Sequence, residues 1–154
     1  MAFISNKRLY NDLIELYTSD YPGVSFVGDF SNDCSCVSLK LRCDVDPSCP
    51  YFGFMLPLTM CFSNYPLACP SVRFDVDVFH PNVYENGLVC LNILSAKEWS
   101  PALSLRVVLL TLLQLLELPN DQDPARREAG ESYIRGDWYE RVVRILDSSK
   151  CERF

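Results

Sequence analysis

Long apolar runs are absent from this chain, and basic residues are outnumbered. The most apolar stretch, 103–118, is interrupted by polar residues, so it predicts a buried helix and not a membrane span. Residues 1–8 contain no apolar core of the kind that a signal peptide needs. The 20 acidic residues exceed the 14 basic ones, and no compact basic patch occurs, which argues against nucleic acid as a partner. We therefore expect no membrane and no nucleic-acid interaction, and we expect a protein or small polar molecule as the partner.

Internal repeats and linker-like segments are also missing. With 154 residues, of which 49% are hydrophobic, the chain suits one compact domain spanning 1–154. There is room for one active site but not for a separate substrate domain.

Cysteine, in contrast, is abundant, with eight residues at positions 34, 36, 43, 49, 61, 69, 90 and 151. Because no export signal is present, we expect reduced thiols in the cytoplasm, the nucleus or both, most of them buried as small apolar side chains. A zinc site at Cys34, Cys36, Cys43 and Cys49 is the alternative. The one-residue gap between the first two and the lack of a nearby histidine argue against it, so no metal is expected.

The hydrophobic pattern predicts an α+β fold. Leu9, Leu13, Leu16 and Tyr17 recur at helical spacing within a helix over 5–20, which Ser5 or Asn6 can cap. Strand-like runs follow at 24–30, 36–45, 51–62 and 72–78, separated by turn residues. This order indicates a four-stranded antiparallel meander with helices on one face.

The periodicity stops at residue 79, and a structured loop is predicted as far as residue 101. Helices then take over, beginning with a buried one over 101–118. Pro124 suits the first position of the next helix, with Asp123 as its cap. Gly136 and Asp137 separate that helix from a last one that runs to about Ser148.

The predicted loop holds the most informative residues. Residues 79–94 read FHPNVYENGLVCLNIL, and WSPAL follows at 99–103, so a thiol, a side-chain amide and the only histidine fall within eleven residues. These motifs, in this order and spacing, resemble the active-site region of ubiquitin-conjugating enzymes. The resemblance covers nearly the whole chain, from about residue 5 to 146, and implies the fold of that family: an N-terminal helix, the four-stranded meander, an active-site loop and C-terminal helices.

The resemblance implies an acyl transferase with no cofactor of its own. Cys90 would carry ubiquitin or a ubiquitin-like protein as a thioester. Asn82 would donate a hydrogen bond to the oxyanion or stabilise the loop. Tyr84 and Asp123 would orient and desolvate the incoming lysine, although Asp123 is equally well explained as a helix N-cap. His80 and Pro81 would rigidify the loop.

The resemblance also implies protein partners: the modifier, its activating enzyme, RING- or HECT-type ligases and substrate proteins. Family members dock ligases through the first helix and two loops. The corresponding residues here are Lys7, Arg8, Leu67, Trp99, Ser100, Pro101 and Ala102. Trp99 is equally consistent with a place in the core.

Features of several branches of the family are mixed in this chain. Residues 79–84 and 122–125 look like the SUMO-conjugating branch, whereas 39–44 and 90–94 look like the Nedd-conjugating branch. The SUMO branch is basic and this chain has a net charge of −6, so ubiquitin or a Nedd-like modifier is the main expectation.

Two other functions deserve comparison with the carrier. A cysteine protease with His80 as the base for Cys90 is disfavoured, because the histidine precedes a proline and no protease signature surrounds the cysteine. A non-catalytic scaffold for another conjugating enzyme is the remaining alternative. Such variants typically lack the cysteine, whereas Cys90, Asn82 and Asp123 are all present here.

Overall fold

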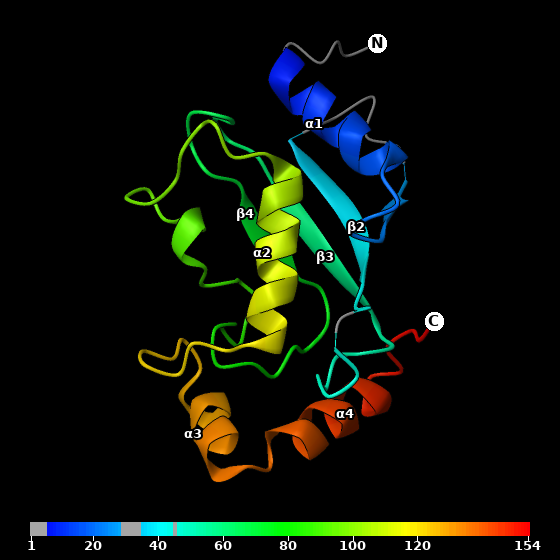
Figure 1. Ribbon diagram of the computed structural model, residues 1–154, viewed down its shortest axis with the longest axis vertical. Helices are drawn as coiled ribbons and strands as arrows, with labels where there is room; N and C mark the ends of the chain where they lie inside the picture. The colour runs from blue at the N-terminus through cyan, green and yellow to red at the C-terminus, as the bar shows by residue number, and fades with distance from the viewer. Residues whose placement is uncertain (1–5, 29–34, 45) are drawn as a thin grey trace.

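The computed structural model describes residues 6–28, 35–44 and 46–154, and its architecture is α+β (Figure 1). The elements, in chain order, are α1 (Lys7–Thr18), β1 (Val24–Val27), β2 (Cys36–Arg42), β3 (Met55–Cys61), β4 (Ser71–Phe74), the 3-10 helix η1 (Asn92–Leu94), α2 (Leu105–Glu117), α3 (Arg127–Arg135) and α4 (Trp138–Ser148). The four strands form one antiparallel sheet in the order β1-β2-β3-β4. The predicted fold class, with its N-terminal helix, meander, loop and C-terminal helices, is therefore confirmed.

Helix α1 follows the predicted stripe except at one position. The backbone N–H of Leu9 donates to the Asn6 side chain at 3.0 Å, which caps the helix, while Ser5 lies outside the described residues. Leu9, Leu13 and Leu16 are buried. Tyr17, expected on the same stripe, is instead 65% exposed and packs its ring near Phe26 at the sheet edge.

The sheet buries one face against α2. Side chains alternate along β2 and β3, so that every second residue points into the core. α2 crosses this inner face in Figure 1 and contributes six buried residues, which are Leu105, Val108, Leu109, Leu112, Leu113 and Leu116. Replacing one such leucine by alanine typically costs 2–5 kcal/mol of unfolding free energy, so this layer supplies much of the stability.

The predicted strands were too long. The strand expected over 51–62 begins only at Met55, because residues 49–53 form turns and Gly53 adopts a positive φ of 86°. The strand expected over 72–78 is β4, which ends at Phe74. Phe30 and Val45, the expected ends of the first two strands, lie outside the described residues.

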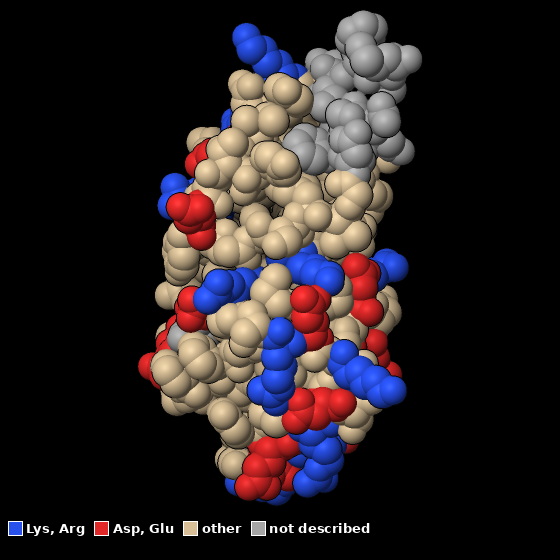
Figure 2. Space-filling model, turned by 90° about the vertical axis from the view of Figure 1, so that its right-hand side faces the viewer, with Lys and Arg blue, Asp and Glu red and all other residues tan. Residues whose placement is uncertain are grey.

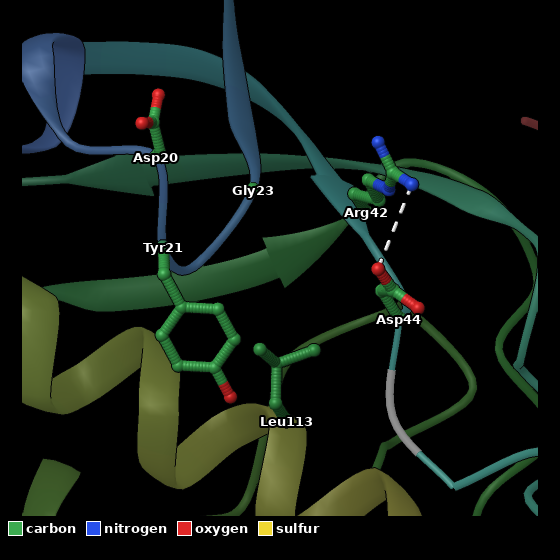
Figure 3. Close-up of a pocket in the computed structure, with 6 residues that line it drawn as sticks. All are labelled: Asp20, Tyr21, Gly23, Arg42, Asp44 and Leu113. Atoms are coloured by element: carbon green, nitrogen blue, oxygen red, sulfur yellow. Dashed lines mark ion pairs between the residues drawn. The ribbon is translucent and has the colours of Figure 1, made fainter.

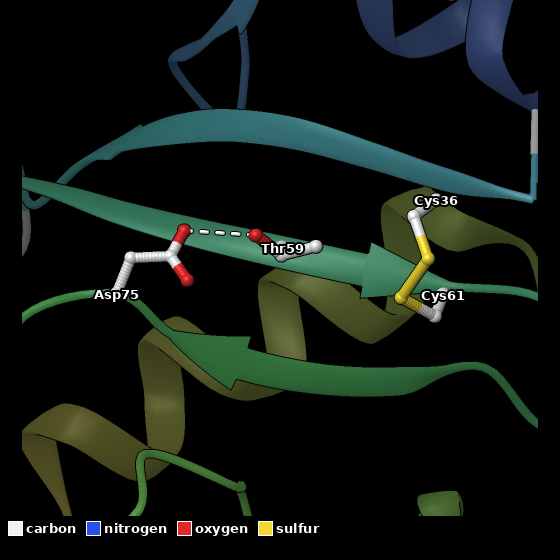
Figure 4. Close-up of a disulfide and its surroundings, with 4 residues drawn as sticks. All are labelled: Cys36, Thr59, Cys61 and Asp75. Atoms are coloured by element: carbon white, nitrogen blue, oxygen red, sulfur yellow. Dashed lines mark hydrogen bonds between the residues drawn. A yellow bond between two sulfur atoms is a disulfide. The ribbon is translucent and has the colours of Figure 1, made fainter. Parts of the chain in front are cut away.

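The cysteines differ from the sequence expectation at two positions. Cys36 and Cys61 form a disulfide (Figure 4), so the prediction that all eight thiols are reduced was wrong. They are direct partners in the register of β2 and β3, with Cα atoms 4.1 Å apart, and this pairing could not be read from a separation of 25 residues.

The four cysteines considered for zinc do not share one environment. Cys34 lies outside the described residues, and Cys36 is disulfide-bonded. Cys43 and Cys49 are buried thiols that donate to the carbonyl oxygens of Leu41 and Leu116. Burial raises the pKa of both, that of Cys49 to about 11, so they behave as small protonated core side chains.

The C-terminal helices begin later than predicted. α2 starts at Leu105, capped by Ser104, and the residues from Pro101 form a turn instead. α3 starts at Arg127, so the expectation of Pro124 as its first residue and Asp123 as its cap was wrong. The N–H of Arg126 donates at 3.1 Å to a carbonyl in the 79–101 loop, which ties down the segment before α3.

The break between α3 and α4 was predicted correctly. Gly136 ends α3 in the left-handed region, with φ of 95°, and α4 then runs to Ser148. The chain returns to the sheet after α4, where the N–H of Met55 donates to the carbonyl oxygen of Glu152 at 2.8 Å. In the described part of the chain no helix is both long and apolar enough to cross a membrane.

Residues 87–89 extend the sheet beyond β4. The N–H of Phe74 donates to the Gly87 carbonyl at 2.9 Å, and the N–H of Val89 donates to the Val72 carbonyl at 3.0 Å. Gly87 has a φ of 91°, and a Cβ atom there would collide with the carbonyl oxygen of Phe74. Glycine is therefore required for the loop to approach the strand this closely.

This contact predicts an unusually costly Gly87→Ala substitution. We expect a loss of about 3–5 kcal/mol in the free energy of unfolding, because the positive φ and the collision with backbone add together. Gly53→Ala is the matched control, since Gly53 has a φ of 86° and no atom near its missing Cβ. Gly53→Ala should lower the free energy of unfolding by only about 1–2 kcal/mol. Urea titration of both variants measures the two losses. Equal costs for the two variants would contradict the close approach.

Candidate active site

Cys90 lies directly after this extension of the sheet. Its side chain is exposed, and its backbone N–H donates to the carbonyl oxygen of Asn82 at 2.8 Å. Val83 and Val89 pair beside it as an isolated antiparallel bridge. The loop therefore presents the thiol to solvent from a hydrogen-bonded backbone, where an incoming group can reach it.

Asn82 connects the Cys90 segment to the loop after α2. Its Nδ2 donates to the carbonyl oxygen of Asn120, and its Oδ1 accepts from the N–H of the same residue, both at 2.8 Å. The side chain is only 3% exposed. Of the two roles expected for this residue, the geometry supports stabilisation of the loop, because the amide is directed at Asn120 and not at solvent near Cys90.

His80 is fully buried and acts as a structural bridge. Its Nε2 donates to the carbonyl oxygen of Leu115 in α2 at 2.8 Å, and its Nδ1 accepts from the N–H of Asn82 at 2.9 Å. These partners require the neutral tautomer with the proton on Nε2. Burial lowers the pKa of the imidazole to about 4. Because both ring nitrogens are occupied, His80 has no free nitrogen to act as a base for Cys90.

Pro81 and Arg126 add a further tie on the same loop. Pro81 is buried, and its carbonyl oxygen accepts the N–H of Arg126 at 3.1 Å. The Arg126 guanidinium forms an ion pair with Asp77 at 2.7 Å and lies over the ring of Phe79. The start of the active-site loop is thus held against the segment that precedes α3.

Tyr84 and Asp123 are both exposed, on two different loops. Tyr84 is 46% exposed, and its N–H donates to the carbonyl oxygen of Leu88 at 2.9 Å. Asp123 follows Asn120 by three residues and does not cap α3. Since Asn82 bonds Asn120, the loop that carries Asp123 is held beside the loop that carries Cys90, and both side chains remain available to an incoming group.

A groove is lined in part by the residue that follows Cys90. A cavity of about 190 Å³ is lined by Leu91, Thr111, Gln114, Leu115 and Leu118. Leu91 directly follows Cys90, and the other four residues come from α2 and its C-terminal cap. The groove is mainly apolar, and Leu91 connects it to the segment that carries Cys90.

A second cavity of about 190 Å³ lies elsewhere, where the end of α1 meets β1, β2 and α2 (Figure 3). The ring of Tyr21 and Leu113 face it, and Arg42 and Asp44 form an ion pair at its side at 3.5 Å. None of its lining residues belongs to the loop over 79–101, so it is not part of the candidate active site.

The expected docking residues come together from three segments. Arg8 of α1 donates to the carbonyl oxygens of Pro101 and Leu103, at 2.7 and 2.8 Å. The Trp99 indole donates to the carbonyl oxygen of Pro66 at 2.8 Å. We call the exposed residues around these bonds the docking surface: Lys7, Leu67, Ser100, Pro101 and Ala102.

Arg8 and Trp99 differ from the rest of the docking residues. Both are half-buried, and their polar groups bond neighbouring segments of the same chain. The Trp99 ring packs near Tyr65, at 6.0 Å between centroids. These two side chains thus support the docking surface from beneath, while Leu67, 72% exposed, projects from it.

Charges on one face of the molecule are mixed. Figure 2 shows basic and acidic side chains interspersed over its lower half, and mostly uncharged residues over the described part of its upper half. Across the described residues, ion pairs such as Arg153–Asp147 at 2.8 Å and Lys40–Glu152 at 2.5 Å join opposite charges. Among the described residues on this face, no basic patch of the kind that binds nucleic acid is present.

Sequence reasoning missed one residue of the site, Asn120, and the contact made by another, Gly87. Asn120 holds Asn82, but its sequence context, after Pro119, indicated only a turn. Gly87 was noticed as part of the motif, whereas its contact with Phe74 depends on strand pairing across thirteen residues. The groove beside Leu91 also requires the packed position of α2, which no local pattern specifies.

The buried imidazole predicts a specific pH dependence. Because His80 has a folded pKa near 4 and an ordinary pKa of 6.5, the unfolded chain binds its proton first. Its contribution to stability is present above pH 6.5 and is lost as the pH falls towards 4, by about 2 kcal/mol at pH 5.

A nuclear magnetic resonance titration checks this directly, since His80 is the only histidine and its Cε1–H signal is unambiguous. The signal should not shift above pH 5. His80→Gln should show a correspondingly weaker loss of unfolding free energy between pH 7.5 and 5. Titration of the wild-type signal near pH 6.5 would refute the buried neutral state.

Comparison with known proteins agrees with this geometry. The family model described as ubiquitin-conjugating enzyme matches residues 8–146. The chain is 37% identical over 111 residues to "Ubiquitin-conjugating enzyme E2-18 kDa" of Schizosaccharomyces pombe, which covers 63% of this chain and 67% of that protein. It is 48% identical over 70 residues to "Ubiquitin-conjugating enzyme E2 N" of Macaca fascicularis, which covers 46% of this chain and 45% of that protein.

The match of the family model extends over most of the described structure, from α1 to α4. It includes the loop that presents Cys90, its braces His80 and Asn82, and the docking surface. The chain therefore belongs to the ubiquitin-conjugating enzyme family, whose members are transferases that act through a cysteine thioester.

Proposed function

We propose that this protein accepts ubiquitin as a thioester on Cys90 and transfers it to lysine side chains of substrate proteins. The observation that carries the proposal is the exposed Cys90 thiol, presented by a braced loop beside a groove that can hold the modifier's C-terminal segment. In the first step the Cys90 thiolate attacks the thioester carbonyl carbon on the activating enzyme. The new C–S bond replaces the old one, and the sulfur of the activating enzyme leaves as a thiolate that takes up the proton released by Cys90.

In the second step a lysine amine attacks the same carbonyl carbon and Cys90 leaves as the thiol. Only about one lysine amine in a few thousand is neutral at pH 7, so the site must desolvate and orient it. Tyr84 and Asp123 are the exposed groups on the two loops joined by Asn82, and we assign them this role. A carboxylate alone would raise the pKa of the amine, so Asp123 acts mainly as a hydrogen-bond acceptor that orients it.

Ubiquitin is the proposed modifier because both relatives described above bear the name of ubiquitin-conjugating enzymes. The net charge of −6 also separates the chain from the basic SUMO-conjugating branch. A Nedd-like modifier is the alternative that the charging experiment below distinguishes.

The partners follow from the same reaction. Family membership implies a modifier, an activating enzyme and ligases in general. We assign RING- or HECT-type ligases and the activating enzyme to the docking surface, whose exposed Leu67 is an apolar contact set among polar and proline residues. We propose the cytoplasm or nucleus as the location. The scaffold alternative is disfavoured by the exposed thiol at position 90.

The assignment of Cys90 predicts the outcome of a charging assay. With ATP, ubiquitin and the ubiquitin-activating enzyme, the wild type should form one thiol-sensitive adduct on a non-reducing gel, and Cys90→Ala should form none. Cys90→Ser should give an adduct that resists thiols, because an oxyester replaces the thioester. Cys151→Ser, which alters a half-buried thiol that bonds Met55, is the matched control and should charge normally.

The same assay is run with the Nedd-type modifier and its activating enzyme, and with SUMO and its activating enzyme. The modifier that forms an adduct identifies the branch of the family. An adduct that persists in Cys90→Ala would overturn the assignment of the cysteine. No adduct with any of the three pairs would favour the scaffold.

The docking surface predicts a second, selective effect. Leu67→Ala should lower RING-stimulated discharge of ubiquitin to free lysine about 5- to 10-fold, because an apolar anchor at an interface is worth about 1 kcal/mol or slightly more. Unstimulated discharge should not change. Ile134→Ala is the matched control, since Ile134 on α3 is equally exposed at 72%. An equal loss in both variants would remove Leu67 from the ligase contact.

A further inference from the structure

A second pair of sulfur atoms lies on the sheet, apart from Cys90. Cys36 and Cys61 are cross-strand partners on the face opposite α2, as the close-up in Figure 4 shows. Cys36 is exposed and Cys61 is half-buried. An exposed disulfide can be attacked by small thiolates in solution, whereas a disulfide inside a core cannot.

We propose that Cys36 and Cys61 form a reversible thiol–disulfide site, which exchanges with low-molecular-weight thiols and disulfides of the glutathione type, and that its oxidation state controls how firmly the docking surface is ordered. The exchange itself does not depend on the proposed function. Only the meaning of the docking surface as a ligase contact rests on it.

The exchange is balanced in atoms and electrons. A small thiolate attacks Sγ of Cys36, the more exposed sulfur; the bond to Cys61 breaks, and Cys61 takes up a proton. A second small thiol then attacks the mixed disulfide, which releases Cys36 as a thiol and forms the oxidised small disulfide. The protein gains two electrons and two protons from two thiols. Oxidation by the small disulfide is the same sequence in reverse.

Two contacts connect this pair to the docking surface. The residue after Cys61 is Phe62, whose N–H donates at 2.7 Å to the carbonyl oxygen of Ser35, the residue before Cys36. The disulfide and this hydrogen bond therefore close the same end of the β2–β3 ladder. Reduction breaks the disulfide and leaves the hydrogen bond between Phe62 and Ser35 at this end.

The ring of Phe62 connects this end of the ladder to the docking surface. It packs edge-on against Tyr65, with centroids 5.6 Å apart, and Tyr65 packs against Trp99. The Tyr65 hydroxyl donates to the buried carboxylate of Asp12 in α1, and its carbonyl oxygen accepts from Asn6. All three segments of the docking surface thus meet at Tyr65. Tyr65 contacts Phe62, and Phe62 directly follows Cys61 of the disulfide.

The other described cysteines are unpaired thiols. Cys69 and Cys151 are half-buried, as Cys61 is, and donate to the carbonyl oxygens of Leu94 and Met55. Cys43 and Cys49 are buried and have raised pKa values, which makes them poor nucleophiles. Cys90 is exposed, so the exchange is mapped in a Cys90→Ala background. The pair on the sheet is then the part of the described chain in which two cysteines already lie within bonding distance.

The first experiment measures the exchange. The Cys90→Ala protein is equilibrated in buffers of reduced and oxidised glutathione, quenched with a maleimide and mapped by mass spectrometry. We expect Cys36 and Cys61 to change together between disulfide and labelled thiols, reversibly. In a Cys61→Ser variant the mixed disulfide should accumulate on Cys36. A pair that stays labelled in every buffer, or that never reduces in the folded protein, would overturn the proposal.

The second experiment measures the effect on the docking surface. The indole N–H of Trp99, hydrogen-bonded to Pro66, is identified by its loss in Trp99→Phe, and its hydrogen exchange is followed by nuclear magnetic resonance. Reduction, or the double change Cys36→Ser and Cys61→Ser, should speed this exchange several-fold. The Trp138 indole, buried and bonded to Phe79, is the internal control and should not change. Equal rates for Trp99 in both oxidation states would refute the coupling.

Thermal stability and ubiquitin charging are measured as two further properties of the protein. Removal of a cross-link over 25 residues should lower Tm by roughly 10 °C, so all exchange is measured well below that temperature. Charging of the protein with native Cys90 is measured separately. Loss of charging together with normal glutathione exchange would contradict the assignment of Cys90 and still support the pair on the sheet.

Discussion

The neutral imidazole of His80 joins the C-terminal part of α2 to the active-site loop, and the geometry of the site depends on this buried link. One ring nitrogen donates to Leu115 and the other accepts from Asn82. Asn82 in turn bonds both Asn120 and the N–H of Cys90. Burial lowers the pKa of the ring and keeps it neutral. A positive charge on the ring would remove the acceptor that the N–H of Asn82 needs.

This arrangement separates rigidity from reactivity. The backbone of this loop is fastened by hydrogen bonds to β4 and to the segment before α3, and its His80 side chain bonds α2. Cys90 and Tyr84 remain exposed on this loop, and Asp123 remains exposed on the neighbouring loop after α2. A carrier must meet an activating enzyme, a ligase and a substrate in turn. A thiol on a firm but open support can do so without large movement, because loops on a rigid scaffold tolerate varied partners.

The fold and the site were predictable from the sequence to different degrees. Alternation along the strands and the helical stripe of α1 specify burial locally, and the 79–103 motifs predicted Cys90, Asn82 and His80 as residues of the site. The cap at Asp123 was wrong, because the N–H of Arg126 bonds Pro81 and the helix begins later. The Cys36–Cys61 disulfide was also missed, since a pairing register is a long-range property and the absence of an export signal suggested reduced thiols.

The sequence by itself determined the fold class and the order of the elements, since both depend on local pattern, and its motif spacing predicted which residues carry the chemistry. Only the tertiary structure decided that Asn82 is directed at Asn120, that Arg8 and Trp99 support the docking surface from beneath, and that Gly87 lies against Phe74. Each of these contacts joins residues that are distant along the chain, and packing of α2 and the sheet brings them together.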